Sequence, residues 1–155
     1  MPRLKTKDEA YDSCLSQGYV RPLEELNLEK IQSLIENAEI NINSANIIAN
    51  AIDKNAKEWM NVFTLYYEAF RIYVEALLHF DKIESSNHQC LFAILCVKYS
   101  YLELDWDFIE QLRTKRHGVN YYGERVAYNE WKSVEVQMKL YVSTLRKELE
   151  HKISK

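Results

Sequence analysis

Apolar residues recur every three or four positions along most of the chain, which is the period of one face of an α-helix. The helices that this pattern predicts cover residues 8–16, 27 to about 54 or 55, 57–80, 88–102, 105–117 and 129–152. The helix over 57–80 has the broadest apolar face and is expected at the centre of the core. Its inward positions are Trp59, Val62, Phe63, Tyr66, Phe70, Tyr73, Val74, Leu77 and Leu78.

Polar residues stand where predicted helices begin. Asp105 can accept the free amide protons of the helix whose inward face carries Trp106, Ile109 and Leu112. One of the polar residues at 85–87 can do the same for the helix that follows it. Each of these caps therefore supports a helix start that the apolar period also indicates.

Glycine and proline are scarce, with 3 Gly and 2 Pro among 155 residues, and Pro2 and Pro22 both lie near the N-terminus. A sandwich or barrel needs many turns, which so few of these residues cannot supply. We therefore predict an all-α protein, an up-and-down antiparallel bundle of four or five helices with a short extra N-terminal helix. A single domain covers residues 1–155, with an N-terminal extension over 1–26 and the bundle over 27–152.

Net charge and cysteine content bear on the ligands and the cellular compartment that we expect. The formal net charge is −3, so no overall positive field attracts nucleic acid, and any such contact has to be local. The cysteine count of 3 is odd, which favours free thiols and a cytoplasmic protein. Apolar runs are far too short for a membrane span, and the first residues lack the apolar core of a signal peptide.

The densest group of chemically versatile residues is LRTKRHGVNYYG at 112–123. One interpretation is structural: cations in a last helical turn complement the helix dipole, and Gly118 closes the helix in a left-handed conformation. The other is a site in which guanidinium groups bind phosphate, His117 transfers a proton and tyrosine rings stack on a base. The tyrosines, Tyr121 and Tyr122, lie beyond the expected cap, and only the second interpretation accounts for them.

Other candidate sites are weaker. A metal site from His79, His88 and Cys90 is not expected, because His88 and Cys90 point to different sides of one helix. Asp105, Asp107 and Glu110 are typical of acids at a helix start. No glycine-rich phosphate loop is present, and no cofactor is expected.

The segment MNVFTLYYEAFRIYVEALLHFDKIESSNHQCLFAIL at 60–95 resembles the long central helix, loop and following helix of HEPN domains. The residues that carry the likeness are Tyr67, Ala69, Phe70, Ala76, Leu77, Leu78 and His88. The segment from 112 to 149 resembles the closing part of the same family. The resemblance implies a helical bundle that forms a homodimer. Many members are metal-independent endoribonucleases in toxin–antitoxin or defence systems, often partnered with a small nucleotidyltransferase.

In active members of that family an arginine and a nearby histidine act on RNA at the dimer cleft. Carried over to this chain, Arg116 matches the arginine and His117 its polar neighbour. Tyr121, or Tyr122 with one more spacer residue, stands where the histidine would be. Arg116, His117 and Tyr121 are the candidate catalytic residues. A phenol with an ordinary pKa near 10 is a poor general base at neutral pH, so we expect binding of RNA or a nucleotide more than cleavage.

The candidate binding residues are Arg113, Arg116, Asn120, Tyr121 and Tyr122. In some toxin members the partner enzyme adenylylates a tyrosine near this motif, which gives Tyr121 or Tyr122 a second possible role. The alternative is a catalytically inactive module that binds a nucleotidyltransferase, its basic helix end serving only as a cap.

Overall fold

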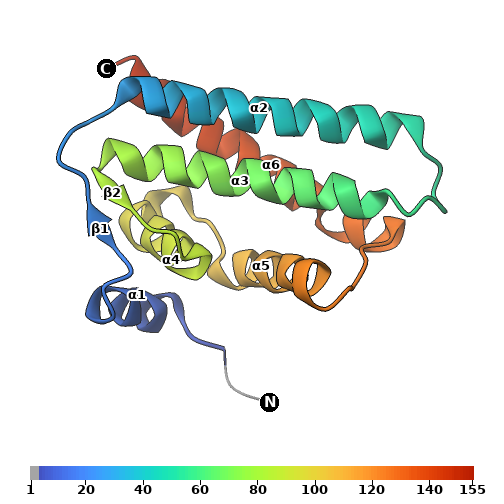
Figure 1. Ribbon diagram of the computed structural model, residues 1–155, viewed down its shortest axis with the longest axis horizontal. Coiled ribbons are helices and arrows are strands. Elements are labelled where there is room, and N and C mark those ends of the chain that lie inside the picture. Colours follow the sequence, from blue (N-terminus) through green and yellow to red (C-terminus); the bar gives the residue numbers. More distant parts are fainter. Residues whose placement is uncertain (1–3) are drawn as a thin grey trace.

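The computed structural model describes residues 4–155, and it confirms the all-α class (Figure 1). The helices are α1 (Lys7–Ser16), α2 (Leu28–Ala51), α3 (Trp59–Phe80), α4 (His88–Lys98), α5 (Trp106–Tyr121) and α6 (Tyr128–Ile153). A 3₁₀ turn (Ser100–Leu102) follows α4, and the two strands are β1 (Arg21–Pro22) and β2 (Ile83–Glu84). No helix within these residues combines the length and apolar character that crossing a bilayer requires.

The long helices form a layered bundle around α3 (Figure 1). Helix α2 packs against α3 as an antiparallel hairpin, and α6 covers another side of α3 after returning antiparallel to α5. Helices α4 and α5 lie below α3, and α1 packs against α4. All nine inward positions predicted for the central helix are buried, so the apolar period located the core correctly.

The predicted caps are confirmed. The carboxylate of Asp105 accepts hydrogen bonds from the amides of Asp107 and Phe108, and the side chain of Asn87 accepts from the amide of Cys90. Trp106 is buried, as are Ile109 and Leu112. Local polar signals therefore identified where α4 and α5 begin.

Two predicted helix ends are wrong. The helix expected over 88–102 stops at Lys98, because the chain tightens into the 3₁₀ turn and Glu103 then takes a left-handed conformation with φ of 55°. The helix expected to reach 54 or 55 stops at Ala51, where Ile52 turns extended. Neither helix end carries a glycine or proline that would mark it in the sequence, so tertiary contacts decide where the helix stops.

The prediction of free thiols is wrong for two of the three cysteines. Cys14 of α1 and Cys90 of α4 form a disulfide across a sequence separation of 76 residues, their Cα atoms 5.7 Å apart. The packing of α1 on α4 brings these residues together, and no local pattern reports it. Cys96 stays free, and burial raises the pKa of its thiol to about 12, so it is unreactive at neutral pH.

A short antiparallel ladder also ties the N-terminal segment to the bundle. Arg21 pairs with Glu84 and Pro22 with Ile83, and an ion pair joins the Arg21 and Glu84 side chains. The indole Nε1 of Trp106 donates to the carbonyl of Lys5 at 2.9 Å. The segment before α2 is thus anchored to both the α3–α4 connection and α5.

Candidate functional site

Helix α5 carries the basic run, and it does not end at Gly118 as expected. Gly118 is buried and helical, and the helix continues to Tyr121. The carbonyl of Gly118 accepts from the amides of Tyr122 and Glu124, and Gly123 takes the left-handed conformation with φ of 66°. No basic residue lies in the last turn of α5, so the interpretation of the run as a helix cap is wrong.

Each cation of the run is held by a carboxylate. Arg116 donates to Glu68 of α3 at 3.1 Å. Lys115 forms an ion pair with Glu130 of α6, and the guanidinium of Arg113 is bound by Glu110 of α5 itself. The partner carboxylates lie on three helices, α3, α5 and α6, so each basic side chain is held in one direction.

Glu110 differs from the helix-start acid that the sequence suggested. Its side chain is only 3% exposed, and it accepts hydrogen bonds from Gln89 of α4 and from Arg113. A buried carboxylate is tolerated when it is paired in this way. Glu110 therefore orients Arg113 and links α4 to α5.

The two arginines open onto a pocket of about 250 Å³ between α3, α4 and α5. The residues that line it are Tyr67, Ser86, His88, Arg113, Arg116, His117 and Tyr121. None of these described lining side chains is a carboxylate. The pocket thus gathers four of the sequence-predicted site residues and adds Tyr67, Ser86 and His88, which are outside the site prediction.

The imidazole of His88 forms a hydrogen bond with the buried phenol of Tyr67. The hydroxyl of Tyr67 lies 3.1 Å from Nδ1 of His88, and within residues 4–155 it has no other hydrogen-bond partner. Burial raises the pKa of Tyr67, so the phenol keeps its proton. In the tautomer of neutral His88 that carries its ring proton on Nε2, Nδ1 accepts this hydrogen bond from the phenol.

The charge state of His88 follows from its surroundings. Burial lowers the pKa of its imidazole, and the positive charges of Arg71 and Arg116 lower it further. His88 is therefore neutral at pH 7, and in the tautomer protonated on Nε2 it offers an N–H donor from that atom. The guanidinium of Arg116 also lies over the ring of Tyr67, 5.6 Å from its centroid, which holds donor and cation close together.

Exposed rings border the pocket. The side chains of Tyr121 and Tyr122 are 68% and 73% exposed, and the ring of His117 lies 4.6 Å and 5.6 Å from theirs. Tyr122 does not line the pocket itself. Asn120 contacts Arg116: with its amide oxygen toward the guanidinium, it accepts from Nη1 at 2.8 Å and Nη2 at 3.1 Å.

No group of three or more His, Cys, Asp or Glu side chains in the described chain is arranged to hold a metal ion. Comparison with protein families, characterised proteins and solved structures finds no match to this chain. The resemblance to HEPN domains therefore stays a prediction from the motif residues.

His88 could have been found from sequence by one signal. It belongs to the residues that carry the HEPN resemblance, and it is polar at the first position of an otherwise apolar helix. Tyr67 belongs to the same set, but it lies on an aromatic helix face that packs in the core, so its residue type did not indicate a site.

Proposed function

We propose that this chain binds single-stranded RNA, or a nucleotide, through a phosphate in the pocket between α3, α4 and α5. The observation that carries the proposal is that two guanidinium groups and two imidazoles line one pocket without a lining carboxylate. Planar guanidinium forks and ring N–H donors suit phosphate oxygens, and the carboxylates of Glu68 and Glu110 that hold the guanidinium groups are not part of the pocket lining.

Each lining residue has its own proposed role. Arg113 and Arg116 bind the phosphate, and neutral His88 donates its Nε2 proton to a phosphate oxygen. The exposed ring of Tyr121 stacks on a base beside His117. Stacking on an exposed phenol requires an unpaired base, which is why the proposal names single strands.

Salt dependence of binding tests the phosphate contacts. The double variant Arg113→Ala/Arg116→Ala is compared with Lys30→Ala/Lys147→Ala, which removes the same charge from exposed lysines outside this pocket. Anisotropy of a labelled ten-nucleotide RNA is measured in chelator across several salt concentrations. The slope of log K against log salt should fall by about 1.4 in the arginine variant, at about 0.7 per lost contact, and stay unchanged in the control.

A second variant keeps the test valid if loss of the arginines also loosens the fold. Tyr121→Ala removes an exposed side chain, and it should weaken RNA binding by roughly fivefold, the lower end of a base–aromatic stack. If wild type binds neither RNA nor nucleotides at low salt, the proposal is lost and the protein-interaction alternative stands.

Two imidazoles in one pocket also favour a second candidate, metal-independent cleavage of RNA. His117 takes the proton of a ribose 2′-hydroxyl, the 2′-oxygen attacks the adjacent phosphorus, and the bond from phosphorus to the 5′-oxygen breaks. The imidazolium of His117 returns its proton through solvent to the 5′-oxygen, which leaves a 2′,3′-cyclic phosphate and a 5′-hydroxyl end. Arg116 and the His88 donor stabilise the charge on the phosphate oxygens.

Cleavage in chelator, followed on a gel, tests this candidate. The activity should vanish in His117→Ala while RNA binding persists, and a substrate with a 2′-deoxy sugar at the cut site should remain intact. Equal cleavage by His117→Ala and wild type would refute the assignment of the proton transfer.

A further inference from the structure

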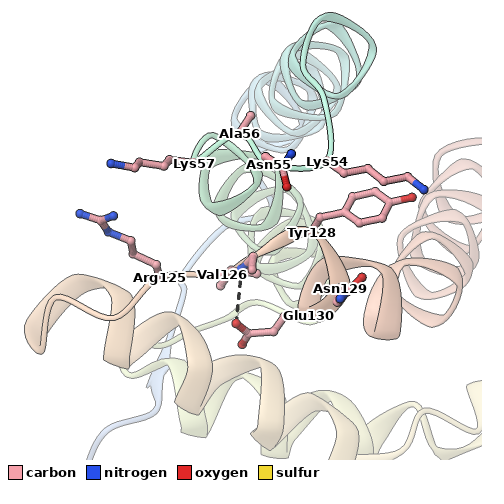
Figure 2. Close-up of a pocket in the computed structure, with 10 residues that line it drawn as sticks. Lys54, Asn55, Ala56, Lys57, Arg125, Val126, Tyr128, Asn129 and Glu130 are labelled. Atoms are coloured by element: carbon pink, nitrogen blue, oxygen red, sulfur yellow. Dashed lines mark hydrogen bonds between the residues drawn. The ribbon is translucent and has the colours of Figure 1, made fainter.

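A second pocket, of about 550 Å³, lies where the α2–α3 connection meets the α5–α6 connection (Figure 2). Residues 54–57 form one wall and residues 125–130 form the other. No site prediction from the sequence included any of these residues. The volume is within the range of roughly 300–1,000 Å³ that small-molecule sites occupy.

The lining of this pocket is positively charged. Lys54, Lys57 and Arg125 are exposed, and within residues 4–155 none of them forms an ion pair. The lining carboxylate, Glu130, is already bound to Lys115 and to the amide of Ala127, the contact that Figure 2 marks with a dashed line. Three cations without a counterion are notable in a chain whose net charge is −3.

The contrast with the first pocket is direct. There each arginine has a carboxylate partner, whereas here the cations are left for solvent or a ligand. The ammonium group of Lys54 lies 5.5 Å from the ring centroid of Tyr128, so one cation rests over an aromatic face. Lys57 and Arg125 extend from the two walls toward the same side in Figure 2.

Contacts with the buried side chain of Trp59 and with the buried Val126 tie the walls of the pocket to the core. Nε1 of Trp59 donates to the carbonyl of Asp53 at 2.8 Å, and the ring of Trp59 meets that of Tyr128 edge-on at 5.0 Å. The carboxylate of Asp53 accepts from the amide of Asn55 at 2.8 Å. Val126 is buried and holds the other wall. The walls are therefore tied to the core while the basic side chains remain free to close on an anion.

We infer that this pocket binds the phosphoryl groups of a nucleotide, free or within RNA. Lys57 and Arg125 bind the phosphate oxygens, and Lys54 contributes charge beside Tyr128. A multiply charged anion is the ligand that suits a pocket where Lys57 and Arg125 extend to one side, Lys54 lies on the other, and none has a counterion in the described chain. The inference does not rest on the function proposed for the first pocket, because the two sites share no lining residue.

Inorganic pyrophosphate is the first probe, titrated into isotope-labelled protein while amide chemical shifts are followed by NMR. Shifts are expected at residues 54–57 and 125–130. Affinity should fall at least about tenfold in Lys57→Ala/Arg125→Ala, since a hydrogen bond to a charged group contributes about 1.5–3 kcal/mol. The control Lys30→Ala/Lys147→Ala removes the same charge elsewhere and should bind within about twofold of wild type, because distant exposed charges are largely screened.

Adenosine triphosphate and a ten-nucleotide single-stranded RNA, titrated separately, identify the source of the phosphate. Shifts at these amides with the triphosphate alone indicate a free nucleotide, and shifts with RNA indicate a nucleic-acid backbone; both support the site. The inference is overturned if none of the three probes shifts these amides, or if the double variant and the control respond alike. Arg113→Ala/Arg116→Ala should keep the pyrophosphate shifts, which separates failure here from failure of the first pocket.

Discussion

Breaking the disulfide between Cys14 and Cys90 should strongly destabilise the protein. The bond closes a loop with a sequence separation of 76 residues, which includes both α2 and α3. Such a crosslink stabilises the fold mainly by restricting the unfolded chain, and the chain-entropy relation gives about 4.5 kcal/mol at 25 °C for a loop of this length. That is a large part of the roughly 5–15 kcal/mol by which proteins are usually stable.

Urea unfolding of oxidised and reduced protein measures the effect. With a slope near 2 kcal/mol per molar urea, the unfolding midpoint should fall by about 2 M on reduction. Both samples carry Cys96→Ala, which removes the free thiol and prevents exchange with the disulfide. Cys14→Ala/Cys90→Ala in the same background should match the reduced protein.

The reasoning fails if the two midpoints agree within about 0.5 M, because a loop of this length cannot contribute so little through chain entropy. It also fails if thiol titration of unreduced, unfolded wild type finds three free cysteines. The first result would contradict the energetic argument, and the second would contradict the bond itself.

The remaining predictions concern the first pocket, the end of α5 and assembly. Glu110→Ala should lower the free energy of unfolding by about 2 kcal/mol, measured by urea titration, because Arg113 loses its buried partner; an unchanged value would show that the pair contributes nothing. The fold lowers the pKa of His88, so as the pH falls through about 6.5 the unfolded chain takes up a proton at this residue more readily than the folded state does. Proton uptake thus favours unfolding. Wild type should therefore lose more thermal stability than His88→Asn between pH 7.5 and 5.5, and equal losses would refute this. Gly118→Ala should stabilise α5 by about 0.5 kcal/mol, because the atoms nearest to its Cβ belong to the movable end of the exposed Glu124 side chain. Gly123→Ala should cost about 1 kcal/mol because of its positive φ, and thermal melting that reversed this order would place the helix end at Gly118 after all. The HEPN resemblance predicts a homodimer, so light scattering should give twice the chain mass of 18.4 kDa, and a monomer at high concentration would contradict it.

The helices of this protein are visible in its sequence because their signals are local. An apolar residue every three or four positions marks the buried face of α3, and Asp105 and Asn87 mark helix starts by bonding amides a few residues ahead. Neither signal depends on what the helix packs against. The all-α class and the concentration of cations before Gly118 follow from the same kind of information.

The end of α5 shows where local information stops. Gly118 and Gly123 both follow the basic run, and either can close a helix. The structure places Gly118 inside the helix and the left-handed turn at Gly123, next to the buried anchor Val126. The basic residues therefore lie within α5 and not in its last turn, and Glu68 and Glu110 orient the two arginines.

The pocket and the disulfide depended on contacts between segments far apart in the chain. Tyr67 and His88 lie 21 residues apart, and Cys14 and Cys90 are 76 residues apart. The helical period gives the direction of each side chain around its own axis, but it carries no information about the rotation and offset between helices. Packing of α3, α4 and α5 sets that rotation by burying their apolar faces together, and this alone brings His88 beside Arg113, Arg116 and His117.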